Sequence, residues 1–163
     1  GKVRALGISN FDASDEVLEK IMSESTVKPA VLQIECHPYA QRLAMREKVK
    51  PYGIHITCWV PLGGAMSNGA LFKDPTIITI AKAHDKTPAQ VILRWHMQEG
   101  FSAIPGASNP DYIKENIEIF DFELTDEEMA QMRGLHKEKR FFNMSLEEKE
   151  RAYIGKMQIP TNK

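Results

Sequence analysis

The chain has 163 residues, of which 42% are hydrophobic and 26% charged, a composition that predicts one packed core and excludes a disordered or fibrous protein. Its 21 Lys and Arg residues nearly balance 22 Asp and Glu residues, so the chain lacks the basic field that holds nucleic acid. No run approaches the roughly 18 apolar residues of a membrane span, and no signal segment opens the chain, so we expect no membrane partner and a cytoplasmic location.

Strands and helices alternate along the first half of the chain. Three short apolar runs predict strands over residues 3–8, 30–35 and 54–60. The run after the first strand predicts a helix whose apolar face is formed by Val17, Leu18, Ile21 and Met22. A weaker helix is predicted over residues 42–50, and Pro51 ends it because proline cannot continue the helical hydrogen bonding.

Helix-start signals mark the second half of the chain, after a loop of small residues over 61–69. Asp74-Pro75 predicts the cap and first turn of a helix over residues 76–84. Thr87-Pro-Ala-Gln90 and Thr125-Asp-Glu-Glu128 have the capping-box form, and Ser145-Leu-Glu-Glu148 repeats it weakly. Between the first two boxes we expect a strand over residues 102–105 and a helix that starts at Asn109-Pro110. The two boxed helices are expected to bury Val91, Ile92 and Trp95, and Met129, Met132 and Leu135.

Four strands that alternate with helices predict right-handed crossovers and a parallel α/β sheet. A doubly wound sheet usually has a Gly-rich phosphate turn after its first strand, and Gly7-Ile-Ser-Asn-Phe11 lacks the G-x-G-x-x-G form. A (β/α)8 TIM barrel remains, and because it needs about 250 residues, four strands are half of one. We therefore expect residues 1–163 to be one barrel half, with βα units and a helix over 1–135 and a tail over 136–163. Since Gly1 directly precedes an apolar run, we also expect further polypeptide before it.

Hydrogen-bonding or aromatic residues lie at the end of each predicted strand, where the chemistry of barrels gathers. They are Ser9 and Asn10, then Gln33, Glu35 and His37, then Trp59, and finally the segment from Pro105 to Asn109. Each also has a structural explanation. Ser9 and Asn10 can cap a helix, and Gln33 can bond a buried partner. Trp59 can fill the core, and His37 can stabilise a turn.

No metal site is expected from the sequence. Cys36 and Cys58 lie in apolar runs, where burial as small hydrophobic residues is the preferred interpretation. The remaining histidines show no metal-binding spacing and are interpreted as surface or helix residues: His55, His84, His96 and His136.

Several motifs carry a family resemblance. Gly7-Ile-Ser-Asn-Phe11, Gln33-Ile-Glu-Cys-His-Pro-Tyr39 and Trp59-Val-Pro-Leu-Gly63 resemble the aldo-keto reductases in wording, order and spacing. Ile104-Pro-Gly-Ala-Ser-Asn-Pro110 resembles the start of the family's last strand and helix, and the match runs from residue 3 to residue 128. The Pro-Gly-Ala-Ser-Asn-Pro wording is similar to bacterial members of the type that includes 2,5-diketogluconate reductases.

The resemblance implies a nicotinamide cofactor and a role for each matching residue. Ser9, Asn10 and Gln33 would hydrogen-bond the carboxamide, and Trp59 would stack on the nicotinamide ring. Leu62 and Gly63 would begin a loop over the pyrophosphate. Ser108 and Asn109 would meet the adenosine phosphate at a helix N-terminus, and Glu115 and Asn116 would reach adenine. The expected cofactor-binding set is Ser9, Asn10, Gln33, Trp59, Val60, Leu62, Gly63, Ile104, Gly106, Ala107, Ser108, Asn109, Tyr112, Glu115 and Asn116.

Four of these positions depart from the family pattern. Gly106 and Ala107 stand where NADPH-selective members often have Lys and Ser, and Tyr112 stands where an Arg is expected. Val60 replaces a Ser that is common beside the stacking aromatic residue. The resemblance implies NADP(H), but the charge-assisted grip on a 2′-phosphate is reduced and Lys114 replaces it weakly, so NAD(H) is also possible.

The family's proton donor, a Tyr assisted by Lys, Asp and His, comes from strands that precede these motifs, so we assign no catalytic residue. The four tyrosines of the chain lie in other contexts: Tyr39, Tyr52, Tyr112 and Tyr153. The resemblance implies that the parent protein reduces aldehydes or ketones with NAD(P)H, with the N-terminal half of the same barrel as partner. The chain alone is expected to be inactive.

Two alternative functions and two explanations of the tail stay open. The protein could be a non-catalytic binding or structural relative, or a half-barrel that associates with itself through its open sheet edges. The tail, with Phe141, Phe142 and Tyr153, matches the place where the family lays a loop over the substrate pocket, and simple packing explains it equally well.

Overall fold

The structure, a computed structural model, describes residues 1–11, 15–149 and 151 and is built on one parallel sheet. The strands β1 (Gly7–Ser9), β2 (Val31–Glu35), β3 (His55–Trp59) and β4 (Ser102–Ile104) lie side by side in sequence order. Parallel neighbours in this order need a crossover between each pair, which the helices provide. This is the arrangement of one half of a (β/α)8 barrel.

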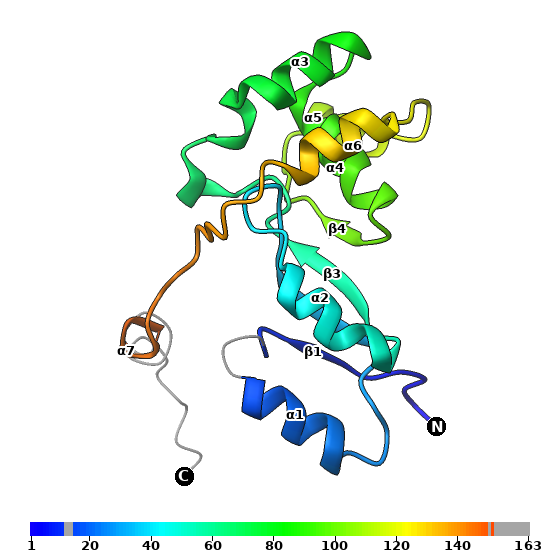
Figure 1. Ribbon diagram of the computed structural model, residues 1–163, viewed down its shortest axis with the longest axis vertical. Helices are drawn as coiled ribbons and strands as arrows, with labels where there is room; N and C mark the ends of the chain where they lie inside the picture. Colours follow the sequence, from blue (N-terminus) through cyan, green and yellow to red (C-terminus); the bar gives the residue numbers. More distant parts are fainter. Residues whose placement is uncertain (12–14, 150, 152–163) are drawn as a thin grey trace.

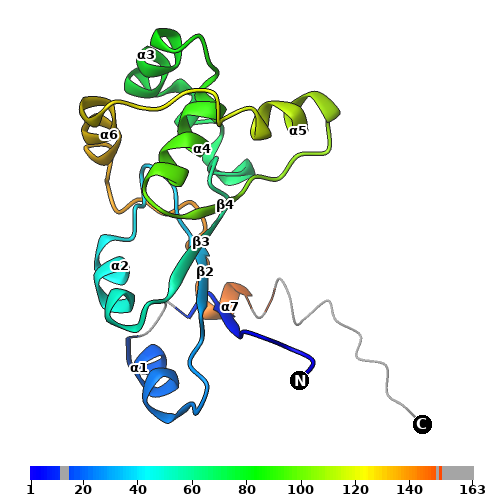
Figure 2. The ribbon, with the colours of Figure 1, turned by 90° about the vertical axis from the view of Figure 1, so that its right-hand side faces the viewer.

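The helices are α1 (Asp15–Glu24), α2 (Leu43–Val49), α3 (Pro75–Ala83), α4 (Pro88–Gln98), α5 (Pro110–Ile117), α6 (Asp126–Arg133) and α7 (Leu146–Lys149). Figure 1 shows them around the curved sheet, and Figure 2 shows α1 and α2 on one side of β2 and β3 with α7 on the other. The side with α1 and α2 is therefore the outer layer of the barrel wall. The chain segment that leads to α7 crosses the inner side.

The predicted helix starts are confirmed. The Asp74 carboxylate accepts from the amides of Thr76 and Ile77 at the start of α3. Thr87 with Gln90, and Thr125 with Glu128, each form a reciprocal capping box. Such a cap contributes about 1 kcal/mol by satisfying amides that the first turn leaves free.

Other element limits differ from the sequence prediction. β1 begins at Gly7 rather than at residue 3, because its pairing with β2 starts only there, and Val3 is 69% exposed. Val17 is exposed, so the apolar face of α1 is narrower than predicted. Pro51 lies inside a 3-10 turn (Lys50–Tyr52) after α2. The predicted loop 61–69 contains a 3-10 turn over Ala65–Ser67, and a second turn, Leu71–Lys73, follows it.

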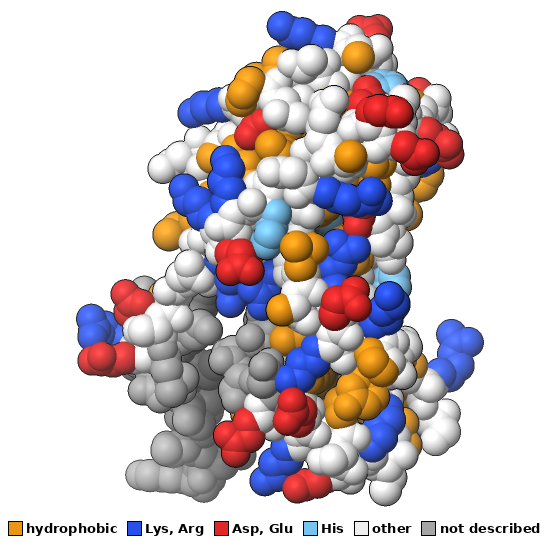
Figure 3. Space-filling model, viewed as in Figure 1, with side chains coloured by type: hydrophobic (Ala, Val, Ile, Leu, Met, Phe, Trp, Pro, Cys, Tyr) orange, Lys and Arg blue, Asp and Glu red, His pale blue; other side chains and the backbone are white. Residues whose placement is uncertain are grey.

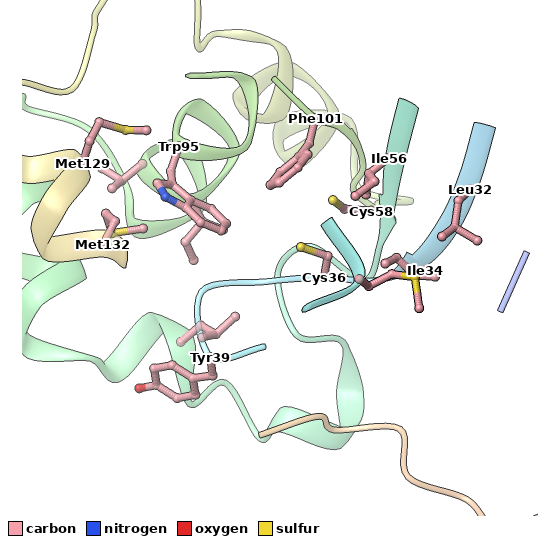
Figure 4. Close-up of a cluster of buried hydrophobic side chains, with 14 of the residues drawn as sticks. Leu32, Ile34, Cys36, Tyr39, Ile56, Cys58, Trp95, Phe101, Met129 and Met132 are labelled. Atoms are coloured by element: carbon pink, nitrogen blue, oxygen red, sulfur yellow. The ribbon is translucent and has the colours of Figure 1, made fainter. Parts of the chain in front are cut away.

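The hydrophobic core lies between the outer face of the sheet and the helices. Leu32 and Ile34 of β2 are fully buried, as are Ile92 and Trp95 of α4. Figure 4 shows Trp95 and Phe101 on one side of this cluster and the strand side chains on the other. Burial of each large apolar side chain contributes about 1.5–3 kcal/mol, so this layer fixes the sheet on α4.

The surface mixes the two signs of charge. On the face drawn in Figure 3, Lys and Arg side chains are interspersed with Asp and Glu side chains, and hydrophobic side chains lie between them. Among the residues that the structure describes, no helix is both long and apolar enough to cross a membrane.

Candidate functional site

The polar strand ends predicted from the sequence meet at one edge of the sheet. Ser9 of β1 is the register partner of Gln33 in β2, and Glu35 is the partner of Trp59 in β3. Just beyond β1, the amide of Asn10 donates to the Gln33 carbonyl at 2.9 Å. Because parallel strands end on the same side, three of them bring amide, hydroxyl and indole groups to one mouth.

Asn10 and Trp59 are linked directly. The indole Nε1 of Trp59 donates to Oδ1 of Asn10 at 2.8 Å. This bond commits the carbonyl side of the Asn10 amide to the indole and leaves its NH2 group as a donor for another molecule. The same bond holds the Trp59 ring at a fixed angle beside the strand ends.

Two strand ends turn sharply through left-handed backbone conformations. Asn10 has φ 60°, which asparagine tolerates because its side chain bonds locally. Val60 has φ 46°, which is a true outlier for a β-branched residue. Strain of this kind costs roughly 1–3 kcal/mol and persists where the surrounding structure imposes it. Here the Val60 turn redirects the chain from Trp59 into the loop at Leu62 and Gly63.

A groove of about 460 Å³ extends from that loop to α5. It is lined by six of the predicted cofactor residues: Leu62, Gly106, Ala107, Tyr112, Glu115 and Asn116. The hydroxyl of Thr87 donates to the Glu115 carboxylate, so the acid is held by the start of α4. The groove therefore connects the β3 loop with the helix that follows β4.

Four other predicted residues lie beside this groove without lining it. Gly63 is buried under the loop, where its φ of +85° and the nearby Ser67 side chain leave no room for a Cβ. Ile104 is 47% exposed at the outer edge of β4. Ser108 and Asn109 are exposed before α5, and Asn109 caps that helix by accepting from the Asp111 amide at 2.9 Å.

Glu35, which the sequence analysis left without a role, is the best-anchored group at the mouth. It is fully buried, and it accepts from the Phe141 amide at 2.6 Å and from Nε of Arg140 at 3.0 Å. Nε2 of His37 lies 3.2 Å from the same carboxylate. Burial alone raises the pKa of Glu35, but the hydrogen bonds from His37, Phe141 and Arg140 outweigh it and lower the pKa to about 2. An ionised Glu35 therefore ties the tail to the end of β2.

The tail places two aromatic rings over the strand ends. The Phe141 ring stacks on His37 with centroids 4.6 Å apart, and the Phe142 ring meets Trp59 edge-on at 5.0 Å. Tyr153, the third aromatic residue predicted for this segment, lies outside the described residues. The tail thus contacts the platform that the sequence analysis assigned to nicotinamide.

Tyr39 was not predicted to be catalytic, and its contacts are structural. Its hydroxyl donates to the Asp74 carboxylate at 2.6 Å, and burial together with this bond raises the pKa of Tyr39 to about 12. The backbone carbonyl of Tyr39 accepts from the amides of Lys137 and Lys139. The predicted turn role of His37 is confirmed, because its amide and carbonyl pair with Ala40 across that turn.

Two buried groups could have been recognised from sequence signals. Glu35 is an acid between the apolar residues Ile34 and Cys36, and a buried carboxylate requires partners, although nothing in the sequence identifies Arg140 as one of them. His96 lies in a helix as expected, but it is fully buried rather than at the surface. Its position on the same face as Ile92 carried that information.

Comparison with known proteins agrees with the geometry. A model of the "Aldo/keto reductase family" matches residues 1–137. The chain is 42% identical over 139 residues to 9,11-endoperoxide prostaglandin H2 reductase of Trypanosoma cruzi, covering 85% of this chain and 48% of the relative. It is 43% identical over 144 residues to morphine 6-dehydrogenase of Pseudomonas putida, covering 83% and 48%. The chain therefore spans about half the length of these curated relatives.

Solved structures show the same relation. MGS-M4, an aldo-keto reductase from a Medee basin deep-sea metagenome library, superposes with a TM-score of 0.81 at 32% identity, over 89% of this chain and 54% of that one. A Gox0644 mutant in complex with NADPH superposes with a TM-score of 0.78 at 38% identity, over 89% and 51%. The four-stranded sheet is accordingly part of a TIM barrel, and the chain belongs to the aldo/keto reductase family.

Proposed function

We propose that the protein containing this chain reduces aldehydes or ketones to alcohols with NADPH, and that this chain holds the cofactor. The observation that carries the proposal is the mouth where parallel strands end together, with the Trp59 indole bonded to the Asn10 side chain and the Asn10 amide bonded to the Gln33 backbone. When bound, the nicotinamide would supply a hydride to the carbonyl carbon.

The donor set fits a nicotinamide carboxamide. That group has one carbonyl acceptor and one NH2 donor, and the mouth offers the NH2 group of Asn10, the hydroxyl of Ser9 and the amide of Gln33. Since Trp59 fixes the Asn10 amide, the carboxamide would meet preset partners, which favours one ring orientation. The glycine at 106 fits the adenosine end, because a side chain there would project into open space in the groove.

Phe142 sets a condition on this role. Its ring packs against Trp59, so a nicotinamide that stacks on the indole must share or displace that contact. Phe141 is held more firmly, because its amide donates to Glu35. We propose that Phe141 and Phe142 form the apolar roof of the substrate pocket and that Phe142 moves when cofactor binds. The roof would exclude water from the carbonyl carbon.

The proton donor is proposed to come from the N-terminal half of the same barrel. Among the described residues, no strand pairs with the outer edge of β1 or of β4, and an apolar groove of about 680 Å³ runs beside β4 between α4 and α5. Exposed apolar side chains of α5, including Ile113 and Ile117, lie along it. Contiguous apolar surface of this kind marks a contact with another segment of protein.

We also propose that the substrate is a small carbonyl compound and that the isolated chain is inactive.

The groove of about 460 Å³ between the β3 loop and α5, proposed to hold adenosine, favours neither NADPH nor NADH strongly. Among the described residues that line it, the charged one is Glu115, which disfavours a 2′-phosphate. The NADPH-bound relative supports NADP(H), and we propose NADP(H) as the main cofactor with NAD(H) as a competent second. The difference between the affinities for NADPH and NADH would be smaller than in a site that offers a bidentate Arg to the 2′-phosphate.

The direct test measures carbonyl reduction by the whole protein across aldehydes and ketoses with NADPH and with NADH. The proposal expects turnover, and it expects Gln33→Ala to raise KM for the cofactor without unfolding the protein. Gln98→Ala is the matched control, because Gln98 lies on α4 and bonds Leu124, away from the mouth. If the whole protein binds neither cofactor and reduces no carbonyl compound, the non-catalytic alternative replaces this proposal.

A second candidate is favoured by the same open edges: two copies of this chain could pair to complete a barrel. Sedimentation of the protein from its natural source separates the two. A single polypeptide of about twice this length supports the N-terminal half as partner. A dimer of 163-residue chains supports pairing of copies.

A further inference from the structure

Three buried side chains converge in the layer between the sheet and α4, on the side away from the cofactor mouth. Cys36 follows β2, Cys58 lies in β3 and His96 lies in α4, and each is completely buried. Their two sulfur atoms and one imidazole nitrogen all lie within 4.8 Å of one another. Figure 4 shows the two cysteine side chains close together, between the strands and Phe101. Three elements distant in sequence thus bring soft donor atoms to one point.

The register of the sheet explains the meeting of the cysteines. Cys58 is the partner of Ile34, and Cys36 comes two residues after Ile34, so both side chains project from the outer face. This spacing forms no recognisable motif, because the ligands come from three separate segments. A metal site was therefore not predicted from the sequence.

The hydrogen bonds of His96 orient a free nitrogen toward this point. Nδ1 lies 2.7 Å from the Ile92 carbonyl, one helical turn earlier, and must donate to it. In the neutral ring Nε2 then carries a lone pair, yet the carbonyl of Cys36 lies 3.2 Å away and is also an acceptor. A metal ion at this point would satisfy both acceptors at once. Histidines that bind metals usually donate their other nitrogen to a backbone carbonyl, as His96 does.

We propose that Cys36, Cys58 and His96 bind one thiophilic divalent cation, with Zn²⁺ as the ion to test. Two thiolates and a neutral imidazole make a complex with Zn²⁺ that has no net charge, which suits a fully buried site. The carbonyl oxygen of Cys36, 3.2 Å from Nε2 of His96, is the proposed fourth donor. Ligand atoms in a tetrahedral zinc site lie roughly 3.5 Å apart, so closure needs only a small inward shift of the three side chains. Both cysteines release their protons on binding.

The ion would tie two central strands to the helix layer. Cys58 precedes Trp59, whose side chain projects from the opposite face of β3 toward the cofactor mouth. A metal at Cys58 would therefore hold the strand that carries the proposed nicotinamide platform. Because the site lacks an open position in contact with solvent, its role is structural rather than catalytic.

The first experiment uses the whole protein, reduced, stripped with a chelator and titrated with Zn²⁺ against a chromophoric competitor. The proposal expects one tightly bound zinc per chain and a melting temperature that rises with zinc concentration. X-ray absorption at the zinc edge should show two sulfur neighbours at about 2.3 Å and nitrogen or oxygen neighbours at about 2.0 Å. Failure to retain zinc, or a shell of nitrogen and oxygen alone, overturns the proposal.

Variants assign the zinc to this site. Cys58→Ala keeps a small apolar residue in the core, and we expect it to lower zinc affinity by more than about 100-fold, since even indirect partners of a metal change affinity 10- to 100-fold. His55→Gln is the matched control on the same strand, because His55 is exposed, and it should leave affinity unchanged. Unchanged affinity in Cys58→Ala overturns the proposal. If that variant does not fold, Cys58→Ser replaces it, and the X-ray absorption spectrum of the unmodified protein shows whether two sulfur atoms bind the zinc.

Discussion

The central strands and the edge strands of this sheet carry similar apolar sequences but reach different degrees of burial. Leu32 and Ile34 in β2 are completely buried, because β1 and β3 flank that strand and helices cover its outer face. On the same face, Ile8 in β1, the register partner of Leu32, and Ala103 in β4, the register partner of Cys58, are only half-buried. The difference teaches that elements of this chain alone bury the centre of the sheet, whereas the two edge strands retain surface that the proposed N-terminal half would cover.

The largest expected loss of stability comes from a substitution in β2, at the centre of the sheet. We expect Glu35→Ala to destabilise the whole protein by about 3–5 kcal/mol, because it removes the acceptor of Arg140 and of the Phe141 amide from a buried site. The urea midpoint measures the change. Glu47→Ala is the control, since Glu47 is exposed on α2 and should change stability by less than about 0.5 kcal/mol. Equal effects of the two variants would show that Glu35 does not anchor the tail.

The interaction of Glu35 with the tail also predicts how stability depends on pH. The pKa of Glu35 is about 2 in the folded protein and 4.5 ordinarily, so the folded state binds fewer protons between these values. Its contribution is fully present above about pH 4.5 and is lost as the pH falls toward 2. We expect urea midpoints to fall more steeply with acid in the unmodified protein than in Glu35→Gln. Parallel curves would mean that Glu35 has an ordinary pKa.

On the exposed apolar face of α5, the stability change caused by Ile117→Ala tests whether a partner segment covers this surface. Ile117 is 64% exposed in this chain, yet we expect Ile117→Ala to cost the whole protein about 2 kcal/mol, because the N-terminal half would cover it. Val27→Ala is the control at a similar 61% exposure in the loop before β2. Chemical denaturation measures both. A loss below about 0.5 kcal/mol for Ile117→Ala would place that residue in solvent.

The loop after β3 should tolerate no side chain at Gly63. We expect Gly63→Ala to cost about 1–2 kcal/mol, because φ is +85° and an added Cβ would lie 2.8 Å from the Ser67 Cβ. Gly106→Ala is the matched control, since an added Cβ there meets nothing within 4 Å. Thermal unfolding of both variants provides the measurement, and an unchanged melting temperature in Gly63→Ala would contradict the loop geometry.

The smallest expected effect is on cofactor preference. Tyr112→Arg should shift the ratio of NADPH to NADH affinity about 10-fold toward NADPH, because it adds a charge-assisted partner for a 2′-phosphate to the groove. Asp111→Asn raises the charge of α5 by the same amount outside both grooves and serves as control. Calorimetric titration with both cofactors measures the ratio. Equal shifts in the two variants would indicate a general charge effect.

Local sequence signals predicted much of the fold, and non-local contacts account for what they missed. The caps at Asp74, Thr87 and Thr125 depend on residues three or four positions apart, so they could be read from the chain. The start of β1 depends on where β2 offers partners, which the sequence does not state. Glu35 and Arg140 are 105 residues apart, and their contact arises only when the tail crosses the sheet.

The candidate site divides in the same way. Ser9, Gln33 and Trp59 were predicted because polar and aromatic residues at the ends of parallel strands must share one edge. The bond between Asn10 and Trp59 and the position of Phe142 on the indole could not be predicted, because both depend on how side chains turn after the strands end. The convergence of Cys36, Cys58 and His96 likewise depends on the register of β2 and β3 and on the seating of α4.

A crystal structure of the whole protein with NADPH tests the central claim most directly. The account predicts the carboxamide within about 3 Å of Ser9, Asn10 and Gln33, the nicotinamide ring stacked on Trp59, and Phe142 moved from its present contact. A nicotinamide bound away from these strand ends, with Phe142 still packed on Trp59, would contradict the account.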